Sequence, residues 1–240
     1  MQKYSQENHE KFKKYFKIKE NPWYFDEKYL EKTKKYLNFI KWIPWIKMIW
    51  VWNSISMNAW KESSDIDLFI VTSKNRLWFI RIILTFIFQI LWVRKTNKFH
   101  AWRFCLSFFA TEKLLDFSNF AIENDIYLYF RIIYFKPILD FDNTYNKFIK
   151  ENSNWADFSE YENIIEKNKE NIKITWKSYW NNCRILDSIE VIFKKIFEWK
   201  TKKTYKKLGK PFWVIINKDM LKFHDKDIRE KIRDYLIWQK

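Results

Sequence analysis

Glycine is nearly missing from this sequence. The 240 residues contain one, Gly209, whereas about 7%, or about 17 residues, is usual. Tryptophan, normally rare, occurs 15 times. Glycine is the residue that most readily adopts the positive φ angles of tight turns. We therefore hypothesise that the gene is read with UGA as glycine and that some of these tryptophans stand for glycine. The alternative is a chain that is truly poor in glycine.

Cysteine and a signal peptide are the next absences. The two cysteines, Cys105 and Cys183, lie far apart, so the sequence has neither a disulfide framework nor a zinc-binding motif. The first 16 residues lack the apolar core of a signal peptide. Together these absences predict a cytoplasmic protein.

Long apolar runs are missing as well. The most apolar segment, residues 76–93, is interrupted by Arg81 and Gln89 and is shorter than the roughly 20 residues that span a bilayer. We expect a helix that begins after Ser73 and covers a sheet, and we expect no membrane partner.

Acidic residues are outnumbered by basic ones, at 29 against 45, for a formal net charge of +16. Such an excess is typical of proteins that bind RNA, and the lysine-rich residues 200–210 are the candidate surface for such a partner. The alternative is a gene rich in A and T, because lysine, asparagine, isoleucine, phenylalanine and tyrosine have A/T-rich codons.

The apolar pattern predicts an α+β chain in three parts. Residues 1–40 are expected to form helices, the second capped by Asp26. Residues 41–150 are expected to form the core, with strands at 46–52, 65–72 and 103–111, a helix at 125–136 that Pro137 stops, and a short helix at 145–150. Residues 151–240 are expected to be mainly helical and rich in lysine.

In the C-terminal part, a helix is predicted from the spacing of its apolar residues, with Asp187 or Ser188 as its cap. These residues are Ile189, Ile192, Phe193, Ile196 and Phe197. A lysine-rich connection at 200–210 and an apolar segment at 212–216 follow. The last predicted helix begins at Asp225 or Asp227 and buries Ile228, Ile232 and Leu236.

The residues that carry chemistry lie at 49–72, IWVWNSISMNAWKESSDIDLFIVT. Alternate residues of a strand point to the same face, so Asp65 and Asp67 share a face at the start of the second strand. Two neighbouring carboxylates repel and are costly to bury unpaired. A bound divalent cation removes that cost. A strand end that hydrogen-bonds a neighbouring loop is the alternative.

The stretch NSISMNAWKESSDIDLFIV resembles the signature of the nucleotidyltransferase superfamily typified by DNA polymerase β. There, a Gly-Ser pair follows the first strand and an Asp-x-Asp opens the next. Asn53-Ser54 stand at the Gly-Ser positions, and Asp65 and Asp67 at the Asp-x-Asp positions. Reading Trp52 and Trp60 as glycine brings the stretch closer to that pattern. The wider chain is similar to a group of bacterial nucleotidyltransferase-domain proteins.

The resemblance implies a small mixed β-sheet of the polymerase β-like type flanked by helices. It also implies transfer of a nucleoside monophosphate from an NTP to a hydroxyl of a small molecule, protein or RNA. Asp65 and Asp67 would hold one or two Mg²⁺ ions, and Asn53, Ser54 and Ser64 would bind the nucleotide. The oligomeric state is left open.

The sequence departs from the family in lacking a third carboxylate on the next strand. Residues 103–111, RFCLSFFAT, contain no acid. Strict alternation would place Cys105, Ser107 and Phe109 on one face. Glu112 or Asp116, just beyond the strand, would have to supply the third ligand. The alternatives are a non-catalytic nucleotide-binding module and a basic RNA- or tRNA-binding protein on the same fold.

Overall fold

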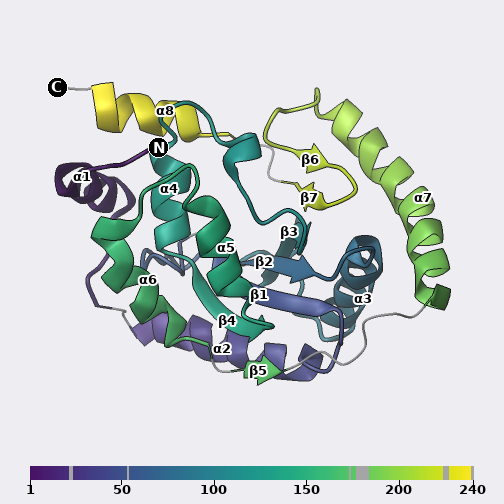
Figure 1. The fold of residues 1–240 in the computed structure, drawn as a ribbon. Helices are drawn as coiled ribbons and strands as arrows, with labels where there is room; N and C mark the ends of the chain where they lie inside the picture. Colours follow the sequence, from purple (N-terminus) through teal and green to yellow (C-terminus); the bar gives the residue numbers. More distant parts are fainter. Residues whose placement is uncertain (22–23, 53, 173, 177–183, 224–226, 239–240) are drawn as a thin grey trace.

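The protein is an α+β structure built on one mixed sheet, seen in a computed structural model (Figure 1). The structure describes residues 1–240 except 22–23, 53, 173, 177–183, 224–226 and 239–240. Among these residues, seven strands lie in the order β5-β4-β1-β2-β3-β7-β6. They are β1 (Ile46–Trp52), β2 (Ile66–Thr72), β3 (Phe104–Thr111), β4 (Lys136–Phe141), β5 (Ile174–Trp176), β6 (Ile215–Ile216) and β7 (Met220–Lys222).

Helices cover both faces of this sheet. They are α1 (Gln6–Phe16), α2 (Tyr24–Ile40), α3 (Leu77–Ile90), α4 (Ile126–Ile133), α5 (Thr144–Asn152), α6 (Glu162–Lys169), α7 (Arg184–Lys207) and α8 (Arg229–Arg233). Short helical turns lie at η1 (Ser118–Phe120), η2 (Ser159–Tyr161) and η3 (Asp234–Trp238). Within the described part of the chain, no helix has the length and apolarity needed to cross a bilayer.

The sheet separates two apolar cores. One, rich in aromatic rings, lies between the sheet and α1, α4 and α5. The other lies between the opposite face and α2 and α3. The central strands β1 and β2 are buried along their whole length, and for β2 this agrees with the apolar residues that follow the acids on both faces of the strand. The two acids at the start of β2 are therefore fixed to a rigid scaffold.

The predicted central strands are confirmed, but the strand β4 was missed. The helix predicted over 125–136 ends at Ile133, and the segment containing Pro137 is a strand between β1 and β5. Proline lacks the N–H that an inner strand uses. It is tolerated because β5 pairs only with Leu139–Phe141, beyond Pro137.

Two predicted helix caps were also wrong. Ser73 does not cap α3, which begins at Leu77; instead Glu190 of α7 accepts hydrogen bonds from the backbone N–H groups of Trp78 and Phe79. Asp26 lies buried in the first turn of α2 instead of capping it. The cap of α3 is therefore a tertiary contact, because a carboxylate from a distant helix accepts hydrogen bonds from the free N–H groups at the start of α3.

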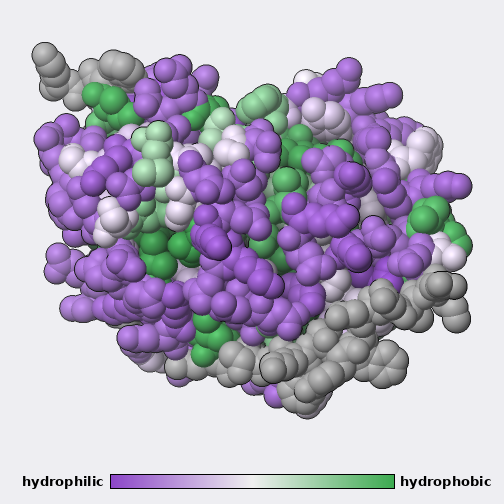
Figure 2. Space-filling view, viewed as in Figure 1, coloured by the Kyte–Doolittle hydropathy of each residue, from purple (hydrophilic) through white to green (hydrophobic). Residues whose placement is uncertain are grey.

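The C-terminal helices also differ from the prediction. The segment predicted as a connection at 200–210 continues α7 as far as Lys207, because lysine is a good helix former. Ile192 and Ile196 are exposed on α7, and Ile228 is half exposed. Figure 2 shows a mainly hydrophilic surface with smaller hydrophobic areas, one of them along α7. Cys183 and Asp225 lie outside the described residues.

Two tryptophans adopt backbone angles typical of glycine. Trp92, just after α3, has φ 54°, and Trp102 has φ 61°. Glycine is the usual residue at such a position after a helix, because a Cβ atom disfavours the left-handed region. By contrast, the two tryptophans at the motif, Trp52 and Trp60, are packed into the two cores. Reading any of them as glycine stays a prediction.

Candidate metal and nucleotide site

The candidate site lies where β1 ends and β2 begins. These strands are antiparallel, with Trp52 opposite Asp67. The chain between them forms a hydrogen-bonded turn over residues 54–58 and a short loop. On the other side, β3 runs parallel to β2 and places Cys105 opposite Asp67. The paired acids therefore lie between two strands that hold them from either side.

Asp65, Asp67 and Cys105 form one cluster of ligand atoms. An oxygen of each carboxylate and the Cys105 sulfur all lie within 4.8 Å of one another. Asp67 is buried, and the Asp65 side chain is 21% exposed. The prediction that the two acids share a face is confirmed by this geometry.

Cys105 joins the acids because of a bulge in β3. The register changes from Asp67–Cys105 to Phe69–Phe108, so β3 contains one residue more than β2 between these pairs. Phe108 therefore joins the core on the acidic face, while Phe109 joins the opposite core. The strict alternation predicted for Cys105 and Phe109 was wrong for this reason. Bulges often re-aim side chains in this way beside functional sites.

Lys95 is a member of the site that sequence reasoning missed. Its Nζ lies 2.6 Å from Asp65 Oδ2. The backbone around Lys95 is held against the start of β3, because the Lys95 N–H donates to the Phe104 carbonyl. A connection between parallel strands must return to the end where the first strand began. The basic residues just before β3 were therefore the sequence signal for a cation beside the acids.

Charge repulsion and burial govern these groups. Burial, followed by the neighbouring Asp67 charge, raises the pKa of Asp65, although Lys95 opposes this. Burial lowers the pKa of Lys95, but its contacts with Asp65 and other negative groups outweigh burial and raise it. The pKa of Asp65 therefore rises mainly through burial, and that of Lys95 mainly through its hydrogen bond with Asp65, while the Asp67 charge adds to both. Burial, with the charge of Asp67, also raises the pKa of Cys105, which keeps the thiol neutral at physiological pH.

The serines predicted to bind nucleotide lie next to the acids. Ser54 is partly exposed in the turn after β1, and its Oγ donates to Ser64 Oγ over 3.4 Å. Ser64 Oγ also accepts the Lys61 N–H at 3.0 Å, and its carbonyl accepts from Tyr29 Oη at 3.0 Å. Ser64 therefore orients the loop before β2. Asn53 lies outside the described residues.

The acids considered as a third carboxylate lie elsewhere. Glu112 follows the far end of β3 and accepts the Lys74 N–H at 3.0 Å. Because a strand rises about 3.3 Å per residue, the seven residues from Cys105 to Glu112 span about 23 Å. Asp116 bonds to Ser118 in the next turn. Neither acid joins the cluster of Asp65 and Asp67.

The cluster fits a divalent cation through its two carboxylates. Mg²⁺ prefers hard oxygen ligands and usually takes one or two carboxylates from a protein. A neutral thiol does not add a ligand of that kind, since thiolate sulfur favours softer metals. Asp65 and Asp67 are thus the residues able to hold a magnesium ion, and Lys95 is the cation that now pairs with one of them.

Comparison with known proteins assigns no family to the chain. No protein-family model and no curated protein matches the sequence, and no solved structure matches the fold.

Proposed function

We propose that this chain is a metal-dependent nucleotidyltransferase on a polymerase β-like fold, transferring a nucleoside monophosphate from an NTP to a hydroxyl acceptor. The observation that carries the proposal is the pair Asp65 and Asp67, which share a face at the start of β2 with their oxygens within 4.8 Å. The turn that bears Ser54 lies beside them. A serine-bearing turn followed by paired acids on the next strand is the arrangement that the resemblance to polymerase β-like nucleotidyltransferases implies.

The residues of the site have separate roles in this proposal. Asp65 and Asp67 would hold Mg²⁺, which would supply positive charge to neutralise the triphosphate and the leaving pyrophosphate. Ser54 Oγ, in the turn after β1, donates a hydrogen bond to a phosphate oxygen of the bound NTP. Lys95 is placed to turn from Asp65 to the same phosphates, where an ammonium stabilises negative charge. Ser64 keeps the loop in position.

A non-catalytic nucleotide-binding module is the second candidate. It is favoured by two observations: a neutral thiol stands opposite Asp67 on β3, and Lys95 already pairs with Asp65. With two carboxylates a metal and nucleotide still bind. Without a third, the attacking hydroxyl lacks an anionic group that helps to activate it.

The first experiment measures metal-dependent binding of a fluorescent NTP analogue, followed by transfer of label from α-labelled NTP to RNA, protein or small molecules. We expect Asp65→Asn and Asp67→Asn to abolish both. Glu62→Gln is the matched control, because Glu62 is exposed in the same loop. Metal-dependent binding without transfer supports the module. Binding that is the same in Asp67→Asn and in the native chain contradicts both candidates.

A further inference from the structure

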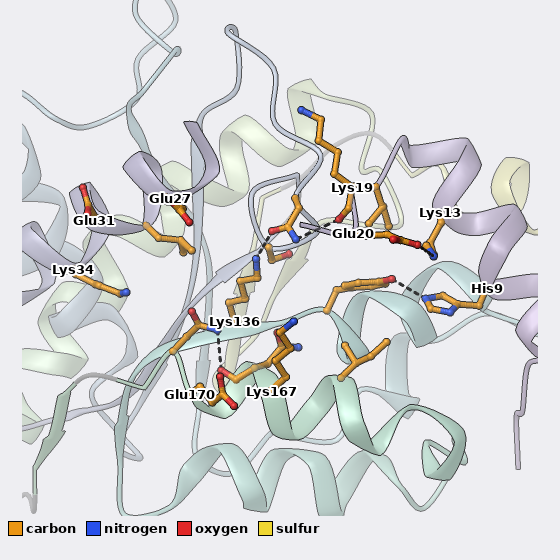
Figure 3. Close-up of a pocket in the computed structure, with 18 residues that line it drawn as sticks. His9, Lys13, Lys19, Glu20, Glu27, Glu31, Lys34, Lys136, Lys167 and Glu170 are labelled. Atoms are coloured by element: carbon orange, nitrogen blue, oxygen red, sulfur yellow. Dashed lines mark hydrogen bonds and ion pairs between the residues drawn. The ribbon is translucent and has the colours of Figure 1, made fainter. Parts of the chain in front are cut away.

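A cavity that does not include the acidic cluster lies beside the sheet. It has a volume of about 640 Å³ and is lined by α1, α2, α6, the turn at 54–58 and the start of β4 (Figure 3). This volume is in the range of cavities that bind small molecules. Apolar side chains from three elements, Ile18, Leu30 and Ile164, line part of it.

The most deeply placed charge in this cavity is Lys136, the first residue of β4. It is 8% exposed. Its Nζ donates to Asn58 Oδ1 over 2.6 Å, and among the described residues it forms no ion pair. Asn58 carries no charge, so this hydrogen bond satisfies one donor of the ammonium without supplying a counter-charge in direct contact. Figure 3 shows Lys136 in the middle of the cavity, reaching towards the turn.

A buried, unpaired lysine is costly to the protein. Burial lowers the pKa of Lys136 to about 8, and the nearby charges of Asp26 and Lys167 act in opposite directions. An apolar side chain of similar length would avoid this cost. A ligand with a negative charge in contact with the ammonium would offset this cost.

The other charges around the cavity are arranged for such a ligand. Its four glutamates, Glu20, Glu27, Glu31 and Glu170, are all exposed. His9 is buried, and burial lowers its pKa to about 4, so the ring is neutral and bonds to Tyr134 Oη at 2.7 Å. The acids thus lie at the rim while the floor is positive, which selects an anion over a cation at depth.

We propose that this cavity binds a small oxyanion, a phosphate or carboxylate group of a metabolite, which pairs with the Lys136 ammonium. The site is independent of the proposed nucleotidyl transfer. Asn58 and Asn168 also line the cavity, and their Nδ2 groups already donate to the Lys19 and Ile133 carbonyls, so the Lys136 ammonium supplies the main contact to the anion.

The first test is amine acetylation of the native chain, with each lysine followed by mass spectrometry. Inorganic phosphate and succinate are added separately at equal ionic strength, with chloride as reference. An anion at ten times its Kd slows acetylation of Lys136 about tenfold and leaves Lys14, exposed on α1, unchanged. Protection by phosphate alone identifies a phosphate site, and protection by succinate alone a carboxylate site. Equal acetylation of Lys136 with and without both anions overturns the proposal.

The second test uses Lys136→Met and thermal unfolding. The variant should be more stable than the native chain in chloride, since a buried charge has been removed. It should gain no further stability from the anion that protects Lys136. A gain from that anion equal to the gain of the native chain places the anion elsewhere and overturns the proposal. Asp65→Asn should bind the anion normally, which separates this site from the metal site.

Discussion

Replacing Lys95 with methionine tests the acidic cluster most directly. The Lys95–Asp65 pair is partly exposed, with 40% and 21% of the side chains accessible, so solvent screening limits its contribution to about 1 kcal/mol. The variant also loses the attraction between Lys95 and Asp67. Two carboxylate charges within 4.8 Å of each other repel by at least about 3 kcal/mol at an effective dielectric constant of about 20, and Lys95 offsets part of this.

We therefore expect Lys95→Met to lose about 1–2 kcal/mol of stability without divalent cations, which lowers the Tm by about 3–6 °C for a chain of this size. A divalent cation should reverse the loss. It meets no competing ammonium in the variant, so its affinity should rise about fivefold to tenfold. Thermal unfolding in chelator and in Mg²⁺ or Mn²⁺ measures the first effect, and calorimetric titration measures the second.

The matched control is Lys98→Met, because Lys98 is exposed in the same connection between α3 and β3. It should change neither the stability nor the metal affinity. The reasoning is refuted if Lys95→Met binds Mg²⁺ and Mn²⁺ no more tightly than the native chain, or if both lysine variants change the affinity equally.

Three further predictions concern stability. Trp92→Gly should stabilise the protein by about 1 kcal/mol, because Trp92 is exposed and its backbone has a left-handed φ of 54°. Trp102→Gly should instead destabilise it, because the Trp102 ring stacks on Tyr29 at 3.8 Å. Chemical unfolding measures both changes. Burial raises the pKa of Asp140 to about 6 from 3.8, so stability falls as pH rises between these values. Asp140→Asn should remove this fall and add about 3 kcal/mol at pH 7, as unfolding across the pH range will show. Arg229→Met should cost about 3–5 kcal/mol, because it leaves Asp125 charged and buried, and an unchanged midpoint in urea would contradict that account.

The glycine hypothesis can be tested on the gene and on the protein. If the codons for Trp92 and Trp102 are UGA, the protein isolated from its source should contain glycine at both positions, as peptide mass spectrometry will show. UGG codons at all 15 tryptophans would refute the hypothesis.

Local sequence determined the central strands and the pairing of the acids. The apolar runs of β1, β2 and β3 and the two-residue spacing of Asp65 and Asp67 are signals carried by neighbouring residues, and the period of a strand converts them into a shared face. The strand β4 was missed because Pro137 disfavours a strand locally, and only the pairing pattern made the proline acceptable.

Tertiary structure alone decided which groups complete the site. Cys105 faces the acids because a bulge shifts β3 by one residue, and Lys95 reaches Asp65 because the chain after α3 returns to the start of β2. In the cavity around Lys136, the ammonium is likewise held by a hydrogen bond to Asn58, which lies 78 residues earlier in the chain. Electrostatic interactions act through space and not along the chain. The sequence therefore predicted the acids, while the fold determined that Lys95 lies beside them and that Lys136 is buried against an uncharged side chain.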